Sequence, residues 1–365
     1  MKKHIAIAAG LAVLSTSAFA TKSRMEALGQ GDSKGSYFIQ DSRNIFRNAA
    51  AVNDMTNYVV TEWGSTAGRN PEGGFFRSAG QFNYGVYLNS DVSAATHTNG
   101  TNTGALSEDD RITAFIGGDM GVKWGASLFR ASSEDEQTVA HKKEHDSMGV
   151  GLGVMSGPLE GFVNFTFKDE AKGNTATAGS KSDADAMEVG LTYQWMSYKF
   201  YADYSKNTQK VTNVTANAGT AFDQDVAVIT VGVGHTQEVS ASSRLFTNIE
   251  YLNTKSEEKI ALTDDKASKL PLTVGFEADA TSWLALRGSV SQVVLLNTEK
   301  NKAGKKKSEA NTTNVNAGAT LNFGKLKVDG MIGTGGNGTE TATNAETGSL
   351  SLDRLMTRVA VHYWF

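Results

Sequence analysis

The chain has 365 residues, among them 38 Gly, 3 Pro and no Cys, and a formal net charge of −4 at pH 7. The absence of Cys excludes disulfides and thiol chemistry, and the mildly acidic balance argues against a nucleic-acid partner. Few Pro and many Gly favour β-ladders, because Pro lacks the N–H that a ladder needs and Gly is tolerated at turns and kinks.

Residues 1–20 have the pattern of a cleaved signal peptide. Lys2 and Lys3 form a basic start, an apolar run extends from Ile5 to Leu14, and Ala18-Phe19-Ala20 fits the small-residue cleavage site. A membrane anchor is the alternative, but this run is shorter than the roughly 20 residues that a spanning helix needs. The sequence therefore predicts an exported protein.

Residues 21–56 differ from the rest of the chain. They contain Asp41, Ile45, Phe46, Asn48 and Ala49 in a short run before the first alternating segment. This run resembles the entry segment of barrels related to the long-chain fatty-acid transporter and the aromatic-hydrocarbon channels, although Ala49 stands where many members have Pro. The resemblance implies a 14-strand barrel with a plug-like N-terminal segment formed around Asp41, Ile45, Phe46 and Asn48. A flexible periplasmic lead is the alternative.

From residue 57 to residue 365, apolar and polar residues alternate in segments of about ten residues, the length of a tilted membrane strand. The pattern predicts an all-β fold, a transmembrane antiparallel up-and-down β-barrel of about 14 strands. The expected strands are 57–64, 74–88, 119–131, 146–155, 159–168, 185–195, 198–208, 225–236, 244–255, 270–279, 283–297, 312–323, 325–333 and 353–365.

The links between these segments alternate in length from residue 119 onward. Short links follow residues 155, 195, 279 and 323, and long polar links lie between them. A membrane barrel explains this alternation, with short periplasmic turns and long extracellular loops. The stretch 89–118 breaks the rule, since a long link falls on the periplasmic side. Ile112 to Ile116 is either an extra strand or a segment folded at the barrel mouth.

Within each segment, residues of one parity are apolar and those of the other are polar. In a barrel the apolar side meets lipid and the polar side lines the lumen. Charges of opposite sign on neighbouring strands, such as Glu277 and Arg287, are expected to pair. The predicted pore-lining residues are Arg77, Lys123, Glu160, Glu188, Lys199, Asp203, Glu250, Glu277, Arg287, Lys325, Lys327, Asp329, Arg354 and Arg358.

Aromatic residues gather beside the short links and at the end of the chain. Val359, Val361, Tyr363 and Phe365 alternate with Arg358 and His362, and a terminal Phe after such a strand resembles the insertion signal of outer-membrane barrels. That resemblance implies recognition by the barrel-assembly machinery. The expected periplasmic girdle consists of Trp195, Tyr198, Trp283, Phe323, Tyr363 and Phe365.

These features predict a porin-like channel in the outer membrane of a Gram-negative bacterium, through which small hydrophilic solutes diffuse passively. Two alternatives stay open: a transporter of hydrophobic small molecules with an apolar pocket near Phe38, Ile45 and Phe46, and a closed structural or adhesion barrel that acts through its loops. The expected partners are outer-membrane lipid, lipopolysaccharide and small solutes, and a homo-oligomer stays open. No enzymatic activity, cofactor or metal is expected.

Overall fold

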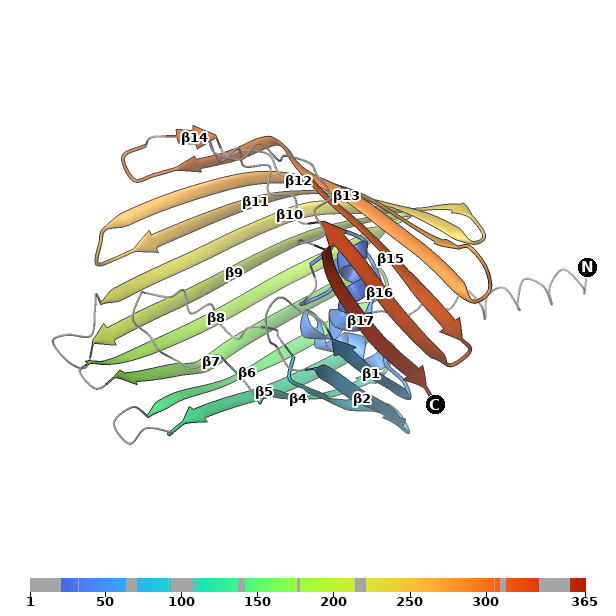
Figure 1. The fold of residues 1–365 in the computed structure, drawn as a ribbon, viewed down its shortest axis with the longest axis horizontal. Coiled ribbons are helices and arrows are strands. Elements are labelled where there is room, and N and C mark those ends of the chain that lie inside the picture. Colours follow the sequence, from blue (N-terminus) through green and yellow to red (C-terminus); the bar gives the residue numbers. More distant parts are fainter. Residues whose placement is uncertain are drawn as a thin grey trace, which may run out of the picture.

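The alternating sequence that begins at Tyr58 folds into antiparallel strands, most of them paired with the next strand along the chain (Figure 1). The computed structural model describes residues 21–31, 33–63, 71–90, 92, 108, 110–136, 142–175, 178–213, 221–304, 306–308, 313–334 and 355–365. The predicted signal peptide lies outside these ranges.

The strands are β1 (Tyr58–Trp63), β2 (Glu72–Ala79), β3 (Phe82–Leu88), β4 (Ile112–Asp119), β5 (Lys123–Asp135), β6 (Lys143–Ser156), β7 (Leu159–Thr175), β8 (Ala178–Trp195), β9 (Tyr198–Asn213), β10 (Phe222–Ser240), β11 (Ser243–Glu258), β12 (Thr263–Asp279), β13 (Leu284–Lys300), β14 (Lys306–Ser308), β15 (Thr313–Phe323), β16 (Leu326–Thr334) and β17 (Leu355–Trp364). Pairing of β1 with β17 closes the sheet into a ring, with Tyr58 opposite Trp364. Among the described residues the ring has 16 strands, and β14 lies outside it, paired with β13. The fold is thus the expected antiparallel β-barrel.

The expected number of about 14 strands is too low, and the first quarter of the barrel explains why. Residues 74–88 are not one strand but the hairpin of β2 and β3, which turns at Gly80 with a positive φ of 63°. The left-handed backbone that this two-residue turn requires is readily adopted by Gly. Ile112 to Ile116 belong to the extra strand β4. With both strands counted, the long link 89–111 falls at the same end of the barrel as the other long links.

The short turns lie at one end of the barrel, called the turn end below, and the long links lie at the other, the loop end (Figure 1). The wall is uneven in height: strands β5 to β13 have 13 to 19 residues, whereas β1 to β4 and β15 to β17 have 6 to 11. A strand needs about 9–11 residues to cross a bilayer, so the tall side extends beyond it at the loop end. Segments expected to be long loops, such as 169–184, in large part continue these ladders.

The outward face of the barrel changes character along the tall strands. On β7, Leu159, Val163 and Phe167 are exposed along the half of the strand next to the turn end, as their parity predicted. Higher on the same hairpins the outer face carries ion pairs, for example Lys168 with Asp146 at 2.6 Å. These polar extensions lack the apolar alternation of a lipid-facing strand, which is why the sequence assigned them to loops.

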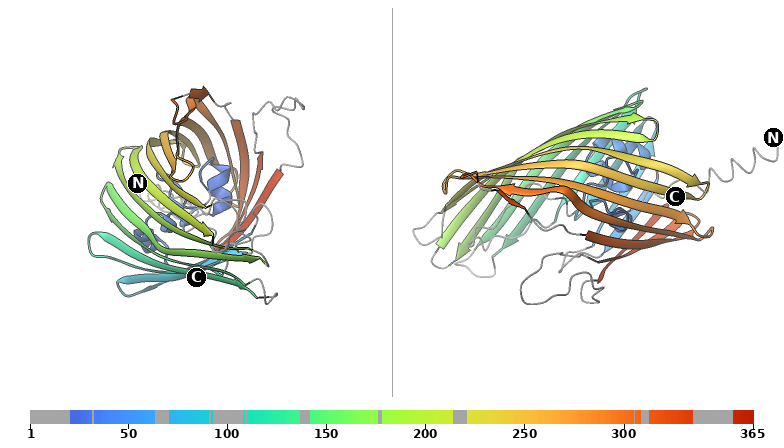
Figure 2. Two further views of the ribbon diagram at one scale, coloured as in Figure 1. Left: turned by 90° about the vertical axis from the view of Figure 1, so that its left-hand side faces the viewer. Right: turned by 90° about the horizontal axis from the view of Figure 1, so that it is seen from above.

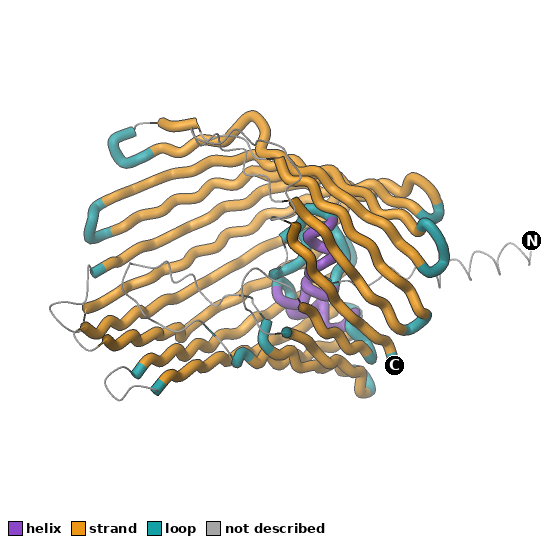
Figure 3. The backbone as a smooth tube through the Cα atoms, in the orientation of Figure 1, coloured by secondary structure: helices purple, strands orange, loops and turns teal. Residues whose placement is uncertain are grey.

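The N-terminal segment, defined as residues 21–56, packs inside the ring (Figure 2). It contains α2 (Lys22–Ala27) and the short 3-10 helices η1 (Ser42–Phe46) and η2 (Ala49–Asp54), drawn purple in Figure 3. Ile45 and Phe46 join Phe76, Tyr87 and Phe115 of the wall in one apolar cluster. No helix within the described ranges is long and apolar enough to cross a membrane.

Glycines on the inner face of the wall let η2 approach closely. A Cβ on Gly125 would collide with the backbone carbonyl of Ala49, and one on Gly153 would collide with the side chain of Asn48. The N-terminal segment therefore lies against a wall whose small residues fit its backbone.

Replacement of one such glycine should loosen the N-terminal segment. We expect Gly153→Ala to cost about 1–3 kcal/mol through overpacking and to increase trypsin cleavage after Arg47 in the folded protein, measured by mass spectrometry. The matched control is Gly161→Ala, because a Cβ there meets only the flexible side chain of Leu191 at 3.2 Å among its close neighbours. Equal cleavage of the two variants would contradict the expectation.

Candidate functional site

The N-terminal segment is fastened to the wall by two groups of buried ion pairs. In the first group, the guanidinium of Arg24 donates two hydrogen bonds of 2.8 Å to the carboxylate of Glu277. Arg287 lies 3.3 Å from Glu277 and 3.4 Å from Asp329, which also accepts a hydrogen bond from the Thr21 hydroxyl at 3.0 Å. The first group thus joins α2 to β12, β13 and β16.

The second group joins the segment to the first two strands. Glu62 of β1 and Glu72 of β2 face each other across the sheet, an arrangement of like charges that is unfavourable by itself. Arg43 lies 3.1 Å from Glu62 and 3.3 Å from Glu72, and Lys22 pairs with Glu72. The Tyr87 hydroxyl donates a further hydrogen bond of 2.6 Å to Glu62. The acidic pair of the wall is therefore neutralised by cations of the N-terminal segment.

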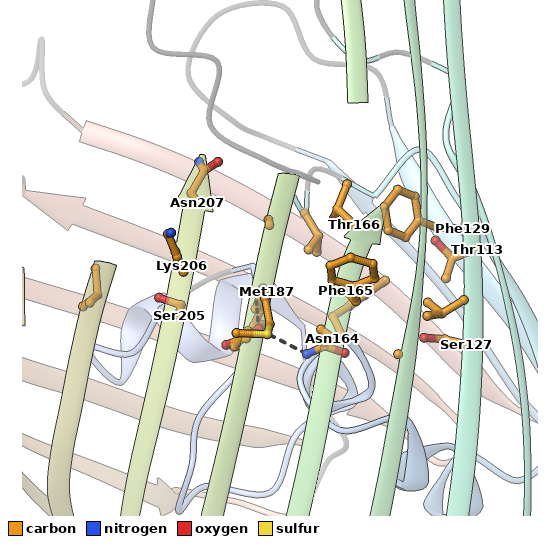
Figure 4. A pocket seen from close by; sticks show the side chains of 18 of the residues that line it. Thr113, Ser127, Phe129, Asn164, Phe165, Thr166, Met187, Ser205, Lys206 and Asn207 are labelled. Atoms are coloured by element: carbon orange, nitrogen blue, oxygen red, sulfur yellow. Dashed lines mark hydrogen bonds and ion pairs between the residues drawn. The ribbon is translucent and has the colours of Figure 1, made fainter. Parts of the chain in front are cut away.

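Two cavities lie in the lumen on either side of the N-terminal segment. The larger, about 380 Å³, opens toward the loop end and is lined in part by Asn164, Glu188 and Gln209 (Figure 4). The smaller, about 300 Å³, lies toward the turn end and is lined in part by Glu160 and Lys199.

Side chains of the N-terminal segment and of β8 and β9 lie between the two cavities. Along β9, Lys199 lines the smaller cavity and Ser205 the larger, and Tyr201 lies between them. The ring of Tyr201 stacks on Tyr37 of the N-terminal segment, with 4.2 Å between centroids, and Arg47 lies 3.8 Å from the centre of the Tyr37 ring. Beside this stack, Lys34 forms an ion pair of 2.5 Å with Glu188. These side chains, of which Tyr37 and Arg47 line the smaller cavity and Lys34 and Glu188 the larger, are called the partition below.

Most predicted pore-lining residues face inward, and most of these form ion pairs or hydrogen bonds within the protein. Lys123 binds Asp54 at 2.5 Å, and Lys199 binds Glu160. Glu250 accepts a hydrogen bond of 2.8 Å from Tyr201. Four further inward residues belong to the ion pairs given above, namely Glu188, Glu277, Arg287 and Asp329. Of the last two inward residues, Asp203 is buried and Lys327 lies over the Trp364 ring. The expected pair of Glu277 with Arg287 is confirmed.

Two predicted pore-lining residues are placed elsewhere. Arg77 is exposed and shares the outer face of β2 with Phe75, since the intervening Phe76 is the buried one. The two-residue turn at Gly80 reverses the parity that had been assumed across 74–88. Lys325 lies exposed in the turn between β15 and β16. Arg354 lies outside the described residues, and Arg358 is placed only by its backbone, opposite Met331.

The six aromatic residues expected near the turn end are placed there. Trp195, Tyr198, Trp283, Phe323, Tyr363 and Phe365 are all exposed, and Phe365 stacks on Phe75 with 5.5 Å between centroids. Their roles as a lipid-interface girdle and insertion signal stay predictions.

The residues predicted for the N-terminal plug fit into the site as follows. The Asp41 carboxylate accepts a hydrogen bond of 2.8 Å from the Arg43 backbone N–H and caps η1, and Asn48 caps η2. Sequence reasoning missed Arg24, Arg43 and Tyr37 as residues that contact the wall. The available signal was the concentration of Lys and Arg before residue 57, facing acidic inward positions such as Glu62 and Glu277. Within the described ranges, no group of three or more His, Asp or Glu could hold a metal ion.

Neither a protein-family model nor a curated protein matches the sequence. Among solved structures, the chain is similar to the CymD monoaromatic hydrocarbon channel (13% identity, 96% of this chain and 98% of that one, TM-score 0.41). It is also similar to the P. putida toluene transporter TodX (12%, 90% and 95%, 0.36) and to OmpT, an outer-membrane protein of Vibrio cholerae (9%, 85% and 95%, 0.39). At such identities the likeness concerns the fold alone, which is that of bacterial outer-membrane β-barrels.

The expectation that the chain is not an enzyme requires correction. OmpT is among the solved structures to which the chain is similar, beside a channel and a transporter. Because a fold does not determine the chemistry of the sites built on it, the exclusion of an enzymatic activity does not follow from the sequence and is withdrawn.

Removal of a buried cation should release the N-terminal segment. We expect Arg43→Met to cost about 3–5 kcal/mol, because it leaves Glu62 and Glu72 buried with one cation fewer. Urea-induced unfolding in lipid vesicles measures this loss, and the double variant Arg43→Met/Glu62→Gln should recover part of it. Arg130→Met is the control, since Arg130 is exposed and lies 3.9 Å from Asp146. Equal effects of the two single variants would contradict the role of the buried pair.

The Asp41 carboxyl should make docking of the N-terminal segment depend on pH. Burial raises its pKa to about 8, although Arg24 lies 3.6 Å away and favours the charged form. The docked carboxyl thus holds a proton that the same group in water loses near pH 4, so stability falls as pH rises through that window. We expect the thermal midpoint to fall more between pH 5 and pH 8.5 in the native chain than in Asp41→Asn. An identical pH profile for both would refute this.

Proposed function

We propose that the protein is an outer-membrane channel through which small hydrophilic solutes diffuse passively, in a lumen that the N-terminal segment narrows. The observation that carries the proposal is the pair of cavities, 380 and 300 Å³, on opposite sides of the segment. The partition side chains lie between them, together with the chain of the N-terminal segment. Movement of the segment and of these side chains would join the two cavities into a path for a small solute.

The outer surface supports the same proposal. The exposed apolar residues near the turn end form a band that lipid would cover, and the charged ladders above it would face water on the cell surface. Export by a signal peptide, insertion through the barrel-assembly machinery, contact with lipopolysaccharide and a homo-oligomeric state stay predictions from the sequence.

Transport of hydrophobic small molecules is a second candidate, favoured by one observation. The larger cavity is lined on one side by Phe46, Phe115 and Phe129. Such a transporter would bind the apolar dye N-phenyl-1-naphthylamine saturably and would show no ohmic current steps.

Planar-bilayer conductance tests the channel. We expect stable ohmic steps from the chain that begins at residue 21. The lock variant Ala27→Cys/Gly318→Cys would tie α2 to β15, because a Cβ at Gly318 lies 2.7 Å from that of Ala27 and a small shift permits a disulfide. If passage requires movement of the segment, oxidation lowers the current several-fold and reduction restores it.

The native chain is the matched control for the lock variant, since it has no Cys and should not respond to reductant. No steps from the native chain, the reduced lock variant or a variant without residues 21–56 would overturn the channel and leave a closed structural or adhesion barrel.

A further inference from the structure

Toward the loop end, the neighbouring strands β9 and β10 carry uncharged side chains on their inner side and charged ones at the intervening positions. On β9 and β10, Gln209 faces Gln224 and Asn207 faces Val226 on the inner side. The intervening Lys206 and Asp225 have the opposite parity and pair at 3.2 Å, and Lys206 also borders the larger cavity (Figure 4). The ion pairs Lys181–Asp183, Lys255–Glu257 and Lys259–Asp223 also lie at such intervening positions.

The inner side of this wall offers amides and hydroxyls to the larger cavity. The Gln209 amide donates to the Ser182 hydroxyl at 3.1 Å, and the Gln224 amide donates to the Ser256 hydroxyl at 2.8 Å. Figure 4 shows more of these groups on neighbouring strands around the cavity, and they are Thr113, Ser127, Asn164, Thr166, Ser205 and Asn207. Such groups both donate and accept hydrogen bonds without net charge.

Each charged side chain that lines the larger cavity is paired with an opposite charge. Lys34 pairs with Glu188 at 2.5 Å, and Arg111 pairs with Glu108 at 2.9 Å and lies 3.8 Å from the centre of the Phe129 ring. An ionic solute that enters would lose hydration without meeting a free counter-charge. The cavity therefore disfavours ions.

The opposite side of the cavity is aromatic. Phe115 of β4 and Phe129 of β5 lie there together with Phe46 of η1, which packs edge-to-face on Phe115 with 5.7 Å between centroids. A cavity with rings on one side and amides on the other matches a solute that has both C–H faces and hydroxyl groups.

We propose that the larger cavity binds a small uncharged polyhydroxylated solute, of the chemical class of the simple sugars. This inference rests on the proposed channel function and names its solute. Gln209, Gln224 and Asn207 hydrogen-bond the hydroxyl groups, and Phe115 and Phe129 contact the apolar face of the solute. The paired charges around the cavity set specificity by excluding ionic analogues of the same size.

Three compounds of similar size test the inference: glucose, anionic gluconate and cationic glucosamine. In planar bilayers with the full chain from residue 21, we expect glucose to block the potassium current at lower concentrations than the two ions at matched ionic strength. Isothermal titration calorimetry of the detergent-solubilised protein measures binding of the same compounds without requiring conduction.

Two variants assign the binding to the inner wall. Gln209→Leu/Gln224→Leu should raise the half-blocking glucose concentration about tenfold, as expected for the loss of two hydrogen bonds. Thr208→Val is the matched control on the same strand, because Thr208 lies on the outer face and bonds Asp185 at 3.2 Å. Gln209→Glu keeps the side-chain shape and adds a negative charge, so it should shift the preference toward glucosamine.

The outcomes separate the inference from the channel proposal. Current steps with equal block by all three compounds, or with none, would overturn the inference and leave the channel intact. Absence of current together with calorimetric binding of glucose alone would overturn the channel and support the site. If glucose gives no calorimetric binding signal and no selective block of the current, the site is refuted. The site is also refuted if Gln209→Glu leaves the preference between glucose and glucosamine unchanged.

Discussion

The rest of the structure depends on the buried contact between the cations of the N-terminal segment and the acids of the barrel wall. Buried ion pairs add little net stability, because desolvation cancels much of their attraction, but each one is costly to break. Arg24 and Arg43 therefore determine the position of the segment more than they add to the net stability of the fold. Glu62 and Glu72, placed opposite each other in the sheet, make the cations a requirement of the wall itself. The position of both cavities follows from this docking.

Barrel width explains why such a segment matters. A barrel of 16 strands is wide enough to leave an aqueous channel when its lumen is empty. Here the inner face is shaped to receive chain instead, with Gly125 and Gly153 making room for the backbone of η2. Among the described residues, the segment leaves two cavities in the lumen, and the partition side chains Tyr37, Arg47, Tyr201, Lys34 and Glu188 lie between them. In the proposed channel, the size of a permeant solute would therefore depend on this segment and its side chains rather than on the wall of strands.

The sequence predicted the architecture and the facing of most strands, because a period of two is a local property that a closed sheet preserves. It failed in two places where the apolar alternation does not report the strand. The tight turn at Gly80 reversed the parity of Arg77, and the polar ladder above Phe167 was mistaken for a loop. The pair of Glu277 with Arg287 was predictable because neighbouring strands bring the two residues together. The contact of Arg24 with Glu277 spans 253 residues, and no periodicity encodes it.

The ion pairs between inward side chains also reduce the electric field that the charged lumen would otherwise present to a solute. A row of inward charges in the sequence suggests a strong internal field, yet most of these charges are satisfied within the protein. Arg287 illustrates this, since it lies between Glu277 and Asp329 and has little free charge to present to a solute. The charges thus build the scaffold, and the amides and hydroxyls of β7 to β10 are left as the groups that meet whatever enters. If the proposed function holds, a barrel wall rich in paired charges would in this way serve an uncharged solute.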